Sequence, residues 1–175
     1  SSHRRQRQMC IRDSVKILRY QIPGFNELNL SQKKLVYYLS QAGLAGRDIM
    51  YDQNYRYNVS IRMALEKIYK NYNGDKSIDD WNLFETYLKR IWFSNGIHHH
   101  YSNDKHEPGF SINYLKSLLN ETNTTLEKEA FDVIFNEEDN KKVNLDESKG
   151  LIKGSAVNFY GPNVTAKDVD CLLYT

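Results

Sequence analysis

The sequence predicts a mainly α-helical fold of antiparallel helices joined by short loops, with a few short extended segments. Apolar residues recur at three- and four-residue spacing in several successive segments, which places them on one face of a helix. Pairs such as Asn-Gly and Pro-Gly separate these segments. The composition, 40% hydrophobic and 26% charged, is that of a folded globular chain.

The first elements are an extended segment and a helix. Val15–Ile22 alternates imperfectly and ends at a Pro-Gly pair, which predicts a short extended segment. Ser31 is the expected N-cap of a helix whose C-cap is Gly43. The apolar residues expected to face the core from this helix are Leu35, Val36, Tyr38 and Leu39. Leu44–Tyr51 predicts a short helical turn that links it to the next helix.

Three further helices follow in the middle of the chain. Gln53–Tyr72 is the longest helical pattern and ends at an Asn-Gly pair. A second helix opens at Ser77–Asp80, where carboxylates interact favourably with the positive end of the helix. Its inward residues are Trp81, Phe84, Leu88, Ile91 and Trp92, and Glu85 and Lys89 form an i, i+4 pair. Ser111 caps a third helix, with Tyr114, Leu115, Leu118 and Leu119 inward.

The pattern weakens after this helix. Thr124–Phe135 is a further helical candidate, and Glu137–Asn144 reads as a charged loop. Leu145–Lys153 has no clear periodicity. Val164–Asp168 has the pattern of a helix start.

Both ends of the chain look foreign to the part between them. Gln8–Ser14 and Cys171–Thr175 match the translation of one end of a sequencing-library transposase adapter and of its reverse complement. We therefore expect residues 1–14 and 171–175 to be adapter-derived tails and residues 15–170 to be part of a longer protein. Without the tails the net charge changes from +2 to −1, because the first fourteen residues carry four arginines and one aspartate. Both cysteines also lie in the tails, which excludes a disulfide framework.

Leaving out the predicted tails narrows the classes of partner that the sequence supports. The basic N-terminal residues are not expected to bind nucleic acid, since they belong to a predicted tail. No apolar run approaches the length of a membrane span. The compartment stays open: a cytoplasmic location is favoured, but a signal peptide would lie outside the sequence in hand.

The loop Asn95–Pro108 is the candidate site. It contains four of the five histidines of the chain, and it is bracketed by Asn-Gly and Pro-Gly breakers. Three readings stay open: a metal site, a loop whose histidines bond to the backbone, and a substrate-contacting loop. His98, His99 and His100 are adjacent and therefore point in different directions, which argues against a common metal ion. The sequence contains neither a HExxH helix, a phosphate-binding GxxxxGK[ST] loop nor a GxSxG nucleophile elbow.

Two runs carry a resemblance to a known family. The run KLVYYLSQAGLAGRDIMYDQNYRYNVSIRMALE and the later run IWFSNGIHHHYSNDKHEPGF resemble dipeptidyl peptidase III, in particular its Bacteroidetes-like branch. The resemblance covers essentially Val15–Asp170. It implies a two-lobed zinc exopeptidase that removes dipeptides from the N-termini of short peptides.

The resemblance also implies a division of roles between this chain and the rest of such a protein. The zinc ligands of the family, a His-Glu-x-x-Gly-His helix and a later glutamate, would lie downstream, so this chain would contain no catalytic residue and no zinc ligand. It would form the helical N-terminal part of the lobe opposite the zinc lobe, with the missing C-terminal part as a partner. The family's loop aromatic that lines the peptide subsites falls at Tyr101, where a tyrosine replaces a phenylalanine. The other loop positions expected to contact substrate are Asn95, Gly96, His98, His99, His100 and Lys105. The alternative function is a non-catalytic, peptide-binding helical module.

Overall fold

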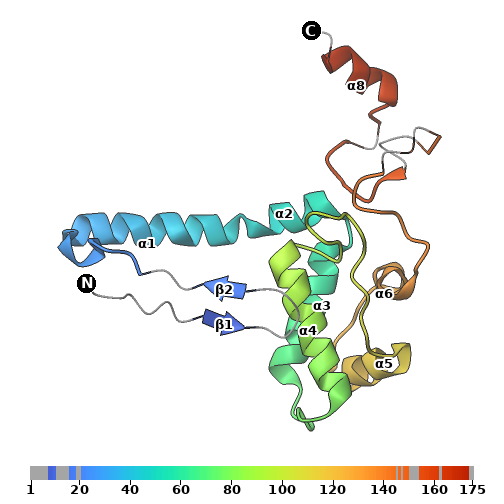
Figure 1. Cartoon of the computed structure of the whole chain (residues 1–175), viewed down its shortest axis with the longest axis horizontal. Helices are drawn as coiled ribbons and strands as arrows, with labels where there is room; N and C mark the ends of the chain where they lie inside the picture. Colours follow the sequence, from blue (N-terminus) through green and yellow to red (C-terminus); the bar gives the residue numbers. More distant parts are fainter. Residues whose placement is uncertain are drawn as a thin grey trace. The chain divides into compact units, whose positions relative to one another are not determined.

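The computed structural model describes residues 8–10, 16–18, 21–144, 146, 148–149, 154–161 and 163–173. The chain forms two compact units, Ser1–Gly46 and Arg47–Thr175, and each is considered by itself. Helices dominate the described part of the chain (Figure 1), which confirms the predicted mainly α fold. None of the helices in these ranges has the length and apolar character that a membrane crossing requires.

The first unit contains a two-stranded ribbon and a long helix. Strand β1 (Gln8–Cys10) pairs antiparallel with β2 (Lys16–Leu18), with Gln8 opposite Leu18. Strand β2 lies within the predicted extended segment. The predicted tail residues 1–7, 11–14 and 174–175 lie outside the described residues, as does most of the unassigned segment 145–153. A 3-10 turn, η1 (Phe25–Glu27), precedes helix α1 (Leu30–Ala45).

Helix α1 differs from its prediction at both ends. Its N-cap is Asn29 and not Ser31: the Asn29 side chain accepts from the backbone N–H of Gln32 at 2.9 Å, and the Gln32 side chain accepts from the N–H of Asn29 at 3.0 Å. This reciprocal capping box satisfies two donors at once, which a lone Ser31 hydroxyl would not do. The helix also continues through Gly43 to a C-cap at Gly46.

The side chains of α1 also contradict the sequence prediction. No residue of this helix is buried. Leu35 and Leu39 are 59% and 63% exposed, and Val36 and Tyr38 are exposed as well. The prediction that these four residues face a core is therefore wrong within the described structure. A capping box and good helix formers are sufficient to define the helix locally, whereas burial needs a covering surface.

The second unit consists of helices connected by loops. Its helices are α2 (Arg47–Asn54), α3 (Asn58–Asn71), α4 (Asp79–Ser94), α5 (Ile112–Glu121), α6 (Lys128–Phe135) and α8 (Ala166–Leu173). The helix predicted for Gln53–Tyr72 is thus wrong at its start, because a turn with a hydrogen bond from Asn58 N to Tyr55 O at 2.9 Å separates α2 from α3. Helix α8 extends to Leu173 and includes part of the predicted C-terminal tail.

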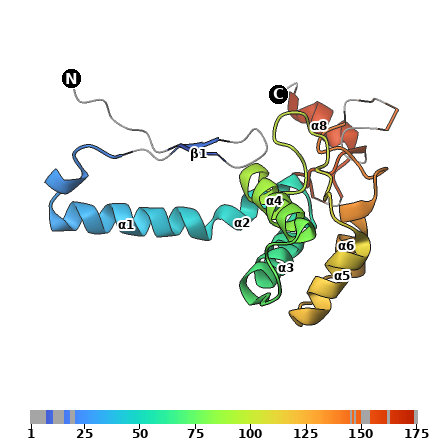
Figure 2. The same cartoon turned by 60° about the horizontal axis from the view of Figure 1, so that its bottom comes forward.

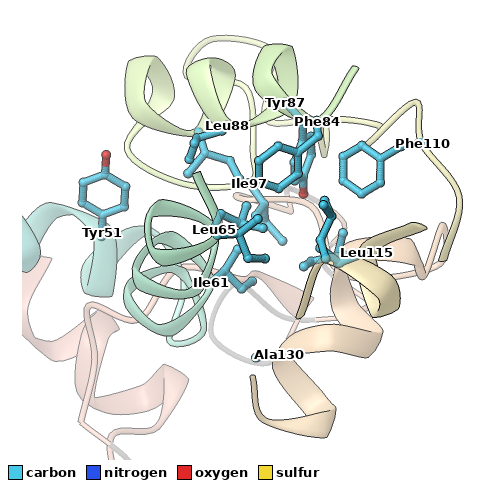
Figure 3. Close-up of a cluster of buried hydrophobic side chains, with 14 of the residues drawn as sticks. Tyr51, Ile61, Leu65, Phe84, Tyr87, Leu88, Ile97, Phe110, Leu115 and Ala130 are labelled. Carbon is cyan, nitrogen blue, oxygen red and sulfur yellow. The ribbon is translucent and has the colours of Figure 1, made fainter. Parts of the chain in front are cut away.

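Helices α3, α4, α5 and α6 supply the core of this unit (Figure 3), and Figures 1 and 2 show them together from two directions. The fully buried side chains include Ile61, Leu65, Phe84, Leu88, Ile91, Leu115, Leu118 and Ile134. Each large apolar side chain contributes roughly 1.5–3 kcal/mol on burial. The inward faces predicted for α4 and α5 are confirmed at these positions, and Ser111 caps α5 by accepting from Tyr114 N at 3.1 Å.

One predicted core residue of α4, Trp92, instead lies at the surface. It is 37% exposed, and its indole N–H donates to Glu66 at 3.0 Å. Glu66 also accepts from Arg62, which is 3% exposed and pairs with Asp48 at 2.7 Å. A buried guanidinium needs such partners to offset its desolvation. The Asp48–Arg62–Glu66–Trp92 chain therefore ties α2 to α3 and holds the indole at the rim of α4.

Candidate functional site

The loop Asn95–Pro108, called the histidine loop below, begins with two residues in unusual backbone conformations. Asn95 is left-handed (φ 53°, ψ 45°) and forms the C-cap of α4. Gly96 has φ +145°, and its N–H donates to Ile91 O at 3.0 Å. A Cβ at Gly96 would overlap the side-chain amide of Asn58. Both residues were predicted substrate contacts, and the structure places them in the backbone turn at the base of the loop.

Two asparagines missed by the sequence analysis hold this base. Asn58 is fully buried, accepts from Ile97 N at 3.0 Å and donates to Tyr51 O at 3.1 Å. Asn54 donates to Asn95 O at 3.0 Å. An amide side chain can satisfy one donor and one acceptor of the main chain at the same time. In the sequence, the only indication of this role is that the two asparagines are polar residues between apolar residues that form the core.

The arms of the histidine loop pair with each other. His98 and Lys105 form an antiparallel bridge. On either side of it, His99 N donates to Asp104 O and His106 N donates to Ile97 O, both at 2.7 Å. The loop is therefore a short ribbon whose turn runs through residues 100–103.

Lys105, predicted to contact substrate, bonds through its side chain to the protein. Its ammonium group donates to the carbonyl oxygens of Val133, at 2.8 Å, and of Asn136. Both carbonyls belong to the C-terminal end of α6, where a cation is favourable. Partial burial lowers the pKa of Lys105, while the carboxylates of Asp139 and Glu137 act in the opposite direction. Lys105 thus anchors the second arm of the loop to α6.

His98 is also an internal residue. It is 2% exposed, its Nε2 donates to Asn140 O at 2.9 Å, and its ring meets the edge of Tyr55 with centroids 5.4 Å apart. Tyr55 in turn donates to Asp139 at 3.0 Å. Burial lowers the pKa of His98 below its ordinary value, against the opposing effects of the Asn140 hydrogen bond and Asp139. This histidine fastens the first arm to the segment 139–142.

The turn of the loop presents the ring of Tyr101 to solvent. Tyr101 is 83% exposed, and its ring centroid lies 4.2 Å from that of His100. The His100 ring also contacts His99, at 4.6 Å, and Phe93 of α4, at 4.9 Å. The turn itself is held by His99, whose Nδ1 accepts from Tyr101 N at 3.2 Å and from Ser102 N at 3.1 Å.

The fourth histidine, His106, contacts α4. Its Nε2 lies 3.0 Å from the hydroxyl of Ser94, which is 3% exposed. Burial first, then the positive charge of Arg90, lowers the pKa of His106 to about 4. His106 therefore carries no charge at neutral pH.

The predicted site residues thus divide into two groups. Asn95, Gly96, His98 and Lys105 shape and anchor the loop, whereas Tyr101 is exposed at its turn beside the half-buried His99 and His100. Within the described ranges, no three His, Cys, Asp or Glu side chains converge so that they could hold a metal ion. A hollow beside the turn is lined by Ser102, Asn103 and residues of the segment 137–149.

Comparison with protein-family models gave no match for this chain, and comparison with curated proteins gave none either. The geometry of the histidine loop and the two runs described above are therefore the basis for a functional assignment.

Proposed function

We propose that this chain is the helical N-terminal part of the non-zinc lobe of a zinc-dependent dipeptidyl peptidase of the dipeptidyl peptidase III family. In this proposal the histidine loop contributes surface that contacts a short peptide. The observation that carries the proposal is Tyr101, which is 83% exposed at the turn of a loop whose base is fixed by buried hydrogen bonds.

Fixed loops with exposed aromatic rings are suited to ligand binding. Tyrosine offers a large apolar area with few rotatable bonds, so little conformational entropy is lost when a ligand covers it. Phe93 and His100 extend the aromatic surface of Tyr101. We assign peptide contact to His99, His100 and Tyr101, and a supporting role to Asn95, Gly96, His98 and Lys105.

The catalytic centre of the proposed enzyme would be supplied by another part of the protein. The family's His-Glu-x-x-Gly-His motif does not occur in this sequence. A zinc ion held by those downstream residues would supply the activation of a water molecule for attack on the peptide bond. The present chain would bind and orient substrate.

The remaining part of the same protein is also the proposed partner of α1. Five consecutive apolar residues, Leu35–Leu39, encircle the axis of this helix and are exposed. A helical turn that carries apolar side chains on all sides is typical of a segment enclosed by a larger body. Its exposed surface therefore supports the proposal that this chain is one section of a lobe.

The decisive experiment is to recover the source DNA beyond residue 170, read the downstream frame and assay the complete protein on dipeptidyl arylamides. A frame with the zinc-binding helix, and zinc-dependent release of dipeptides, is the expected result. A complete frame without these ligands would leave the alternative, a non-catalytic peptide-binding module.

The role of the loop is tested by Tyr101→Ala in the complete enzyme. We expect KM to rise about five- to tenfold with little change in kcat, the size of roughly 1 kcal/mol of lost aromatic contact. Tyr101→Phe is the matched control, because it keeps the ring and should keep KM. An unchanged KM in Tyr101→Ala would contradict the assignment of this loop to the peptide site.

A further inference from the structure

In two imidazoles of the histidine loop, those of His98 and His99, a second proton would disturb the hydrogen bonding that the structure shows. A neutral imidazole carries one N–H, and protonation adds the other. The Asn140 carbonyl can only accept, so the neutral His98 ring carries its proton on Nε2. A second proton would have to bind Nδ1, which is buried and has no hydrogen-bond partner in the described structure. Charging His98 in place would therefore leave a buried donor unpaired.

His99 presents the same difficulty at the turn. Its Nδ1 lone pair accepts the backbone N–H groups of Tyr101 and Ser102, at 3.2 and 3.1 Å. A proton on this nitrogen would turn the acceptor into a donor and break both bonds. These two bonds set the backbone direction at Tyr101, so protonation of His99 would release the turn.

Cations surround the loop and add to the cost of a further positive charge. The positive charge of Arg90 in α4 lowers the pKa of His106. The charges of Lys105 and Lys142 lower the pKa of His98 in the same way. Desolvation lowers the pKa of His100, and the positive charge of Lys142 adds to this effect. Its Nδ1 is buried and has no hydrogen-bond partner among the described residues.

The acidic groups near the loop are already paired. Asp139, which faces His98 and Lys105, accepts from the hydroxyl of Tyr55 at 3.0 Å. Asp104, which faces His99, pairs with Lys141 at 3.3 Å. The negative charge of Glu137 stabilises the charged form of Lys105. A protonated imidazole would therefore have to compete for these carboxylates.

We infer that the histidine loop is an acid-labile latch, which holds Tyr101 in its exposed position only while His98 and His99 are neutral. Acidification releases the turn and leaves the helical core folded. The release is a property of the loop alone; its consequence for peptide binding rests on the proposed function. The latch would make peptide binding at this site decline at acidic pH.

The pH window follows from linkage. The folded-state pKa values of His98 and His106 lie below the ordinary value of about 6.5, so the closed loop binds fewer protons than the open loop. The closed form is therefore fully favoured above about pH 6.5, and it loses stability as the pH falls below that value.

The test is amide hydrogen exchange of the full 175-residue chain at pH 7 and pH 5, with rates corrected for the intrinsic effect of pH. We expect the protection of the Tyr101 and Ser102 amides to fall about tenfold per pH unit for each histidine that must titrate. The amide of Leu88, in the core of α4, should keep its protection and so report that the core remains folded.

The matched variant is His98→Gln with His99→Asn. The Gln amide can donate to Asn140 O as Nε2 does, and the Asn carbonyl can accept from the turn as Nδ1 does, but neither side chain titrates in this range. His106 remains in this variant, so the variant should retain more protection at pH 5 than the wild type, and each single substitution should retain part of that gain. Equal protection of the wild-type turn at both pH values would overturn the latch, as would an equal loss in wild type and double variant.

The latch and the proposed function can fail separately. Peptide affinity of the complete protein is measured at pH 7, where the latch is closed, so absence of peptide binding there would count against the proposed function and leave the exchange result intact. A pH-independent turn in a protein that binds peptide would refute the latch alone.

Discussion

Helices α1 and α4 have the same length, 16 residues, and both are rich in apolar and aromatic side chains, yet only α4 contributes to a core. Helix α4 buries Trp81, Phe84, Tyr87, Leu88, Ile91 and Ser94, and α1 buries none of its residues. The difference lies in the arrangement of the apolar residues. The buried residues of α4 recur at three- and four-residue spacing on one face, whereas Leu35–Leu39 of α1 are consecutive and encircle the axis. Apolar content alone therefore does not show which surface a helix will bury.

The largest expected effect is the loss of a core ring from α4. Phe84 is fully buried, so Phe84→Ala should reduce the free energy of unfolding by about 3–5 kcal/mol through lost burial and a residual cavity. Leu39→Ala is the counterpart on α1, where the side chain is 63% exposed, and should change it by no more than about 0.5 kcal/mol. Urea denaturation of both variants measures the difference. Similar losses would show that α1 is covered in solution.

A smaller effect is expected where the core meets the histidine loop. Asn58→Ala removes the partners of Ile97 N and Tyr51 O and should cost about 1–3 kcal/mol, because a buried group without its hydrogen bond is destabilising. The exposed Asn113 of α5 offers the control, and Asn113→Ala should be nearly neutral. Equilibrium denaturation tests both variants. A neutral Asn58→Ala would contradict the anchoring role assigned to this side chain.

The smallest effect concerns the cap of α1. Asn29→Ala should destabilise this helix by about 1 kcal/mol, since it removes the acceptor of the capping box. Faster exchange of the Gln32 and Lys33 amides would report the loss. Ser31→Ala should leave these rates unchanged, because Ser31 lies within the helix. The reverse ranking of the two variants would restore Ser31 as the cap.

The site was predictable in position and only partly in role. Breakers on both sides and four clustered histidines indicated the loop, and they did so from neighbouring residues alone. The roles depended on contacts across long sequence separations: His98 with Asn140, Lys105 with the end of α6, and Ile97 with Asn58. No spacing rule within the loop contains those partners. For this reason His98 and Lys105 were predicted as substrate contacts, although the structure shows them bonded to the protein.

By itself, the sequence determined the features that depend on neighbours along the chain. These are the mainly helical class, the N-cap of α5, most of the inward faces of α4 and α5, and the turn at Asn95 and Gly96, because side-chain periodicity and backbone freedom are local properties. The tertiary structure alone decided burial and anchoring. It left α1 uncovered, placed Trp92 at the surface beside Glu66, and separated the histidines that secure the loop from the exposed ring of Tyr101. Burial requires a second surface, and the sequence of one element does not specify where that surface lies.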